Sequence, residues 1–334
     1  MISLNKFLYK LFLNNSYIQS FLFDLDKFFF QKKNCLKESI LITGLARSGT
    51  TILLNSVHNN GIYSSFTYEN LPIIMAPNIN KFFFNQETIE YSERAHKDGI
   101  FINNKSPEEI DEYFWINMTE SEFVKESYLS IHAPSSNDIN AYKQFINQFL
   151  VSISKNKLIV KNNNSILRLK GLLKHRVFNK VIFCFRNPLK QSLSLLRMHK
   201  KFSNITEYEL TFMRWLGHYE FGSNHKPFKL TESQNPFSIN SINYWLWLWK
   251  EYYSYFLDHY SLEQNIFPIS HEDICLNEGY VKKINDKLNL NLNYNLFHEK
   301  KHNNISYKSL NTKLVADCNE IHRELRKKSY EMFE

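Results

Sequence analysis

The chain has 334 residues, of which 43% are hydrophobic, and a formal net charge of +8. This length is enough for one large α/β domain with insertions or for two small domains, and the apolar content supports a hydrophobic core. A basic balance suits a ligand with several phosphate charges. The sequence carries no zinc-ligand, RNP or helix-turn-helix signature, so we expect no nucleic-acid partner.

The cysteine pattern favours a reducing compartment. No CxxC spacing occurs, and nothing indicates a disulfide framework among Cys35, Cys184, Cys275 and Cys318. Because Cys184 lies inside an apolar run, it is expected to be an unreactive core thiol. We therefore expect a cytoplasmic protein.

Residues 1–37 are predicted to form a helical segment that precedes the main domain. Residues 7–30 are rich in Phe, Leu and Tyr with lysines interspersed. They lack an uninterrupted apolar stretch followed by a small-residue cleavage site, and no run of 18 apolar residues exists, so we expect neither a signal peptide nor a transmembrane helix. Two interpretations stay open: a helix packed on the domain, or an interfacial helix in peripheral contact with a membrane.

A glycine loop, residues 44–49, follows an apolar strand that begins near Ser39 and precedes an amphipathic helix. Glycine is scarce, with 8 in the chain, yet Gly44 and Gly49 fall five apart here. Such a loop aims backbone N–H groups and a helix N-terminus at an anion. Further donors are expected from Arg47, Ser48, Thr50 and Thr51. Because Thr50 replaces the lysine of the usual ATP-binding loop, a different phosphate ligand is indicated.

Strand–helix alternation is interrupted after a second predicted strand, residues 62–66. Residues 67–157 lack clear alternation and are interpreted as an acceptor-binding insertion, with a helix around residues 141–153. Residues 158–200 return to strand–helix–strand–helix, and residues 201–240 are interpreted as a second insertion or lid.

A second motif begins where the apolar run Lys180–Phe185 is closed by Arg186. The run predicts a buried parallel strand, and Pro188 suits the first turn of a new helix. Arg186 then lies at the carboxyl end of a strand, where open α/β sheets bind ligands. With Ser194, two turns into the helix, it could hold a second phosphate.

The last third of the chain is predicted to be mainly helical. Trp245, Trp247 and Trp249 open a long aromatic helix that reaches about Tyr260, and such tryptophans are more often core residues than a ligand platform. The main domain is placed at residues 38–300. A C-terminal helix within residues 301–334 shows an apolar stripe of Leu314, Cys318, Ile321 and Leu325.

Together the two motifs resemble the PAPS-dependent sulfotransferases, where PAPS is 3′-phosphoadenosine 5′-phosphosulfate. Arg47-Ser-Gly-Thr-Thr51 resembles the loop that holds the 5′-phosphosulfate. Arg186-Asn-Pro188, with Ser194 eight residues after the arginine, resembles the loop that holds the 3′-phosphate. The pattern looks closer to the bacterial and Golgi-type members. Ala46 departs from it, since the family usually has proline there.

Two further stretches look like parts of the same family. Ile266–Ile274 resembles its late strand and turn, with His271 in place of a tyrosine. Leu158–Lys161 looks like a strand that usually ends Lys-x-Pro, although Asn162 and Asn163 follow here.

The resemblance implies an α/β fold, a P-loop-like three-layer sandwich with a central parallel sheet and helical insertions. It implies PAPS as co-substrate, no metal, and an acceptor with a hydroxyl or amine, a carbohydrate among the options. Arg47 and the loop N–H groups would stabilise charge on the leaving oxygen. Lys161 would contact the sulfonate, and Glu69 would be the base, ahead of His58 and His132.

Two other functions stay open. A P-loop kinase or NTPase with a degenerate motif predicts Mg-ATP binding and a strand that ends in aspartate, whereas the apolar strands here end in Thr43, Lys161 and Arg186. A non-catalytic relative would keep the fold and bind a partner through the aromatic insertions.

Overall fold

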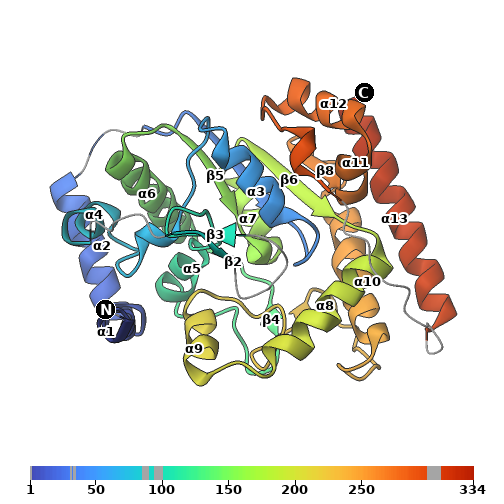
Figure 1. Ribbon diagram of the computed structural model, residues 1–334, viewed down its shortest axis with the longest axis horizontal. Helices are drawn as coiled ribbons and strands as arrows, with labels where there is room; N and C mark the ends of the chain where they lie inside the picture. The colour runs from blue at the N-terminus through green and yellow to red at the C-terminus, as the bar shows by residue number, and fades with distance from the viewer. Residues whose placement is uncertain (1, 31, 33–34, 85–89, 94–100, 299–309) are drawn as a thin grey trace.

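A computed structural model describes residues 2–30, 32, 35–84, 90–93, 101–298 and 310–334 (Figure 1). Its centre is a four-stranded parallel sheet in the order β5-β1-β6-β8. The strands are β1 (Glu38–Thr43), β5 (Lys157–Lys161), β6 (Lys180–Phe185) and β8 (Ile266–Ser270). Because they run in one direction, the turns that follow them meet at a single edge, where a ligand site is expected.

Helices cover both faces of this sheet, which confirms the three-layer α/β fold. Alternate residues of a strand point to opposite faces. Ile40 and Ile42 therefore pack with one set of helices, and Leu41 packs with the other. The first set holds α3 (Thr50–Asn59), α11 (His271–Leu276) and α12 (Glu278–Leu288); the second holds α6 (Ser136–Ile153), α7 (Leu169–Lys174) and α10 (Ile242–Tyr260).

Several sequence predictions are confirmed. The helix α8 (Pro188–Phe202) begins at Pro188, and α10 begins just before the tryptophans. Trp245 and Trp249 are fully buried core residues. The helix α13 (Thr312–Phe333) packs against α10 and β8 through the buried residues of its apolar stripe, Leu314, Cys318 and Leu325.

The predicted strand at residues 62–66 is wrong. Ser64 forms one parallel bridge with Leu158 at the edge of the sheet. The chain then leaves this edge, because Phe66 accepts the N–H of Glu108 and Thr67 pairs with Pro107. The segment opens the first insertion instead of extending the sheet.

The first insertion mixes short helices and strands, and its long helix α6 starts earlier than predicted. Ser135 and Asp138 form a capping box that begins α6 at Ser136. The other elements are η1 (Tyr68–Asn70), α4 (Pro77–Phe83), β2 (Ser92–Glu93), β3 (Phe101–Ile102), α5 (Glu112–Met118) and β4 (Leu129–Ser130). A 3₁₀ segment η2 (Asn163–Arg168) follows β5.

The second insertion contains α9 (Glu207–Trp215) and β7 (Phe228–Lys229). β7 pairs in parallel with β4, so the two insertions share a small sheet. A short 3₁₀ turn, η3 (Tyr294–Leu296), follows α12.

Two helices lie where the sequence predicts the helical N-terminal segment, α1 (Ile2–Leu13) and α2 (Ser16–Phe30). They gather with α4 at one end of the molecule, far from α12 and α13 (Figure 1). α2 packs against α4, α5 and α6.

Candidate functional site

The glycine loop runs from the end of β1 into α3 at the carboxyl edge of the sheet. Gly49 has a φ of +100°, and a Cβ there would lie 2.5 Å from Nδ1 of His271. A Cβ on Gly44 would collide with the carbonyl oxygen of Cys184. Glycine is therefore required at both positions, because β6 and α11 press directly on the loop.

Arg47 is held in an unusual backbone conformation within this loop. Its φ is +71°, in the left-handed region that non-glycine residues seldom adopt. Its Nε donates a hydrogen bond to Oγ of Ser194, at 3.0 Å. The first predicted motif therefore contacts the second directly.

The three hydroxyl residues of the loop differ in where they point. Ser48 is buried at 1% exposure, and its N–H donates to the carbonyl of Leu45. Thr50, the first residue of α3, donates from Oγ1 to Oδ1 of Asn163 at 3.3 Å. Thr51 lines a cavity beside the loop. The threonines rather than Ser48 are placed to meet a ligand through their side chains.

Arg186 follows β6 and is held by α11. Oε1 of Glu272 lies 3.8 Å from Nε of Arg186, and both Glu272 oxygens accept the N–H of Asn187, at 3.0 and 3.1 Å. Asn187 also caps α8 by accepting the N–H of Lys190. These bonds fix the arginine at the turn between strand and helix.

His271 lies within electrostatic range of both arginines. Burial, followed by the charges of Arg186 and Arg47, lowers the pKa of His271 to about 3. The ring is neutral at pH 7, so it does not add a positive charge of its own. The positive charges of Arg47 and Arg186 therefore both act on the region around His271.

Gln191 on α8 bonds directly to the glycine loop. Its Nε2 donates to the carbonyls of Leu45 and Ala46, at 2.9 and 3.0 Å. Its Oε1 accepts from Trp249 at 3.0 Å and from Tyr253 at 3.2 Å. No role for Gln191 is predicted in the sequence analysis. Its position one turn before Leu195, on the buried face of α8, is the feature from which such a role could have been predicted.

Lys161 ends β5 and lies within a charged cluster, which we define as Lys161, Glu108, Glu109, His218 and Glu220. Its ammonium is 3.0 Å from Oε1 of Glu108 and 2.9 Å from Oε2 of Glu109. Burial would lower the pKa of Lys161, but these two carboxyl groups outweigh it and raise the pKa above its usual value. The lysine stays positively charged.

The remaining members of the cluster balance one another. Burial raises the pKa of Glu109 to about 8. Burial alone would lower the pKa of His218 and raise that of Glu220, but their contact at 3.7 Å sets the two values at about 9 and about 2. At neutral pH His218 is an imidazolium opposite a carboxylate, while Glu109 is largely protonated.

Glu109, His218 and Glu220 have ligand atoms within 4.8 Å of one another, close enough to hold a metal ion. Lys161 already supplies a cation 2.9 Å from Glu109. With a pKa of about 9, His218 would have to lose its proton before it could ligate. The ion pair of His218 with Glu220 and the contact of Glu109 with Lys161 account for this group.

A cavity of about 180 Å³, the loop cavity, lies between the glycine loop and the charged cluster. Its polar lining comprises Arg47, Thr50, Thr51, Glu108, Lys161, Asn163, His218 and Glu220. Its other lining is mainly apolar and aromatic: Ala46, Tyr68, Ile102, Phe202, Phe212, Met213, Leu216 and Phe221.

The structure does not bring Glu69 to the loop cavity. Glu69 and His58 line a separate cavity of about 350 Å³, and Glu69 accepts from Nδ2 of Asn104 at 3.3 Å. Its neighbour Tyr68 lines the loop cavity instead, because successive residues of a 3₁₀ turn point about 120° apart. His132 is also remote: it accepts from Nε of buried Arg168, at 3.1 Å.

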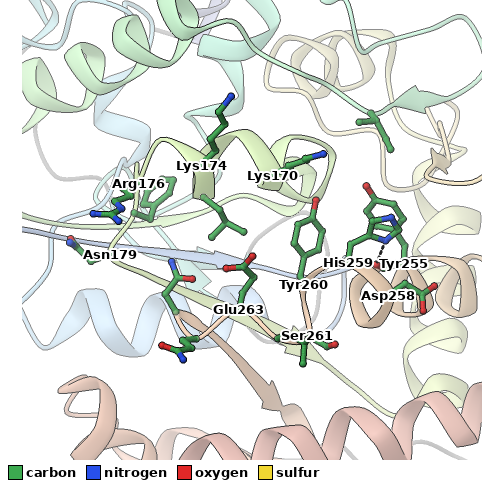
Figure 2. Close-up of a pocket in the computed structure, with 16 residues that line it drawn as sticks. Lys170, Lys174, Arg176, Asn179, Tyr255, Asp258, His259, Tyr260, Ser261 and Glu263 are labelled. Atoms are coloured by element: carbon green, nitrogen blue, oxygen red, sulfur yellow. Dashed lines mark hydrogen bonds between the residues drawn. The ribbon is translucent and has the colours of Figure 1, made fainter.

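A larger hollow of about 1270 Å³ lies at the opposite edge of the sheet. Figure 2 shows Lys170, Lys174 and Arg176 on one side of it. The other side is formed by the end of α10, which includes Tyr260, and by Glu263 beyond it. None of the motif residues lines it. Since parallel α/β sheets bind ligands at the carboxyl edge, we place the functional site at the loop cavity.

No protein-family model and no curated protein matches the chain. Sulfotransferase STF1 from Mycobacterium tuberculosis H37Rv matches in structure over 96% of this chain and 84% of its own, with a TM-score of 0.50 and 11% identity. Sulfotransferase STF9 from Mycobacterium avium matches over 96% and 74%, with a TM-score of 0.46 and 13% identity. The likeness to STF1 shows that this chain has a sulfotransferase-like α/β fold.

Proposed function

We propose that the protein is a sulfotransferase that moves a sulfuryl group from PAPS to a hydroxyl or amine. The observation that carries this proposal is the direct contact of the two motif sites. Arg47 donates a hydrogen bond to Ser194, and Gln191 donates to the glycine loop. Arg186 lies two residues before α8, the helix that carries both Gln191 and Ser194. A nucleotide with anionic groups on both its 5′ and 3′ sides suits two cationic sites at one sheet edge.

The residues present fit that co-substrate. The N–H groups of the glycine loop, with Arg47, Thr50 and Thr51, would hold the 5′-phosphosulfate. Arg186 and Ser194 would hold the 3′-phosphate by charge-assisted hydrogen bonds. PAPS supplies an activated sulfuryl group, which leaves the bridging oxygen of the 5′-phosphate.

We propose Glu108 rather than Glu69 as the base. Its carboxyl group lines the loop cavity, 3.0 Å from the ammonium of Lys161 and 3.4 Å from the hydroxyl of Tyr68. The acceptor oxygen or nitrogen forms a bond to sulfur while the bond from sulfur to the bridging oxygen breaks, and the acceptor proton passes to Glu108. Once Glu108 is protonated, Lys161 is released from that ion pair to face the transferred sulfonate.

The apolar lining favours an acceptor hydroxyl carried on an apolar or aromatic group over a carbohydrate. A sugar would place its other hydroxyl groups against Phe212, Met213 and Leu216, where they find no partner and pay a desolvation cost. The loop cavity of about 180 Å³ is close in size to a cavity of about 150 Å³ that binds benzene, so beside the sulfonate it favours a small acceptor group over a sugar chain.

Thermal unfolding with two nucleotides tests the proposal. Adenosine 3′,5′-bisphosphate without metal should stabilise the protein, by about 2.7 kcal/mol at a hundredfold excess over Kd. Preferential stabilisation by Mg-ATP would favour the kinase, and no response to either would favour the non-catalytic relative. Transfer of labelled sulfate from PAPS to phenolic and sugar acceptors then tests the chemistry and the acceptor class.

A further inference from the structure

One end of the molecule exposes a group of large apolar side chains, which we call the aromatic surface. They belong to α1, α2 and α4, which lie together in Figure 1. The members are Phe7, Leu11, Tyr17, Phe21, Phe28, Phe29, Phe82 and Phe83, with exposures from 43% to 88%. Exposed apolar residues scattered singly are ordinary, whereas a gathered set marks an interaction site.

The helix α2 exposes several aromatic rings on one face, with Asp24 among them, and buries two polar side chains on the opposite face. Tyr17, Phe21 and Phe28 are spaced i, i+4 and i+11, so they share one helical face. The opposite, buried face carries Gln19 and Asp26 together with Phe23. Two of these three buried side chains are polar, whereas the inner face of a surface helix is usually apolar.

Specific hydrogen bonds fix that orientation. Gln19 donates to the carbonyl of Pro72 at 2.9 Å and accepts the N–H of Met75 at 3.2 Å. Asp26 accepts from Nδ2 of Asn78 and from the N–H of Ile79, both at 2.8 Å. Rotating α2 to bury its rings would break these bonds and leave their partners buried and unsatisfied. The outward position of the rings is therefore built into the fold.

The charges beside the rings indicate what covers them. Lys10 and Lys27 are exposed on α1 and α2, against one exposed acidic residue there, Asp24, while the ammonium of exposed Lys81 on α4 donates to the carbonyl of Ser152 at 2.8 Å. A symmetric dimer through this surface would bring the lysines of both copies into one interface. An anionic bilayer attracts them, and aromatic rings partition into its interfacial region.

We propose that the aromatic surface binds the interface of an anionic lipid bilayer, with α1, α2 and α4 lying on the membrane. Among the described residues, no helix combines the length and apolar character needed to cross a bilayer, so the contact is peripheral. This inference is independent of the sulfotransferase proposal.

Flotation of the full chain with vesicles tests it. The protein should float with vesicles of phosphatidylcholine and phosphatidylglycerol, and much less with phosphatidylcholine alone. The triple variant F21S/F28S/F83S should bind at least about tenfold more weakly, because it removes three inserting rings. These side chains are 63–77% exposed, so the fold should be unchanged. K10Q and K27Q, which each remove one positive charge, should each weaken binding about fivefold.

The matched control is L262S, which removes a 90% exposed leucine outside the aromatic surface and should leave flotation unchanged. The proposal is overturned if the wild-type chain does not float with anionic vesicles. It is also overturned if the triple variant floats equally well. A dimer in light scattering that the triple variant abolishes, without vesicle binding, would assign the surface to self-association instead.

Discussion

The two sides of the loop cavity are built on different principles. On the motif side, the glycine loop, Arg186 and Ser194 are held by backbone geometry and by hydrogen bonds, and the cations there face a neutral His271. On the insertion side, the ammonium of Lys161 pairs with Glu108 at 3.0 Å and the His218 ring pairs with Glu220 at 3.7 Å, so positive and negative charges balance. The two sides therefore differ in charge: the motif side carries two arginines beside a neutral ring, whereas the insertion side sets cations against carboxylates.

The substitution Glu108→Gln is the strongest test of this difference between the two sides. Loss of the proposed base should lower kcat about 10²- to 10⁴-fold, while the affinity for adenosine 3′,5′-bisphosphate changes little. Single-turnover sulfate transfer and calorimetric titration measure the two quantities. Glu69→Gln is the matched control and should retain activity. The reverse result would restore Glu69 as the base.

Arg186→Ala tests the motif side. It should weaken the binding of adenosine 3′,5′-bisphosphate by about 2 kcal/mol, roughly thirtyfold, because a charge-assisted hydrogen bond to the 3′-phosphate is lost. AMP, which lacks that phosphate, should bind almost unchanged in the same titration. Arg197→Ala serves as the control, because Arg197 lies on the exposed face of α8, the helix that follows Arg186. Equal losses for both nucleotides would contradict the role of Arg186.

Gln191→Leu tests whether the two motifs act as one site. The change removes donors to Leu45 and Ala46 and an acceptor for Trp249. We expect about tenfold weaker nucleotide binding and a loss of about 2 kcal/mol in the free energy of unfolding. Urea unfolding and titration would show it. A stability loss with unchanged affinity would limit Gln191 to a structural role.

The insertion side should also govern the stability at alkaline pH. The folded-state pKa of His218 is raised to about 9, so its stabilising effect is complete below about pH 6.5 and is lost as pH rises through 9. Glu109, raised to about 8, acts in the same direction between about pH 4.5 and 8.

His218→Gln should therefore flatten the decline in unfolding free energy between about pH 6.5 and 9, by an amount of the order of 2 kcal/mol. Unfolding in urea at a series of pH values measures it. An unchanged alkaline slope would show that His218 does not carry this dependence.

The motif side was predictable from sequence because its parts are local. A loop with Gly44 and Gly49 after an apolar strand specifies its own geometry, and Arg186-Asn-Pro188 does the same for the next turn. The insertion side was not predictable, because Glu108 and His218 reach Lys161 only through the folding of segments that show no strand–helix alternation. Glu69 illustrates the limit: one residue earlier in the same 3₁₀ turn, Tyr68 faces the cavity.

The small sheet between β4 and β7 has a consequence for engineering. The first insertion supplies Tyr68, Ile102 and Glu108 to the loop cavity, and the second supplies Phe212 and other apolar residues. Leu129 pairs with Phe228, and the N–H of Leu129 donates to the carbonyl of Pro227. The backbone of each insertion therefore helps to hold the backbone of the other in place. Grafting new selectivity onto this scaffold should therefore succeed when both segments are transplanted from one donor, and fail when either is exchanged alone.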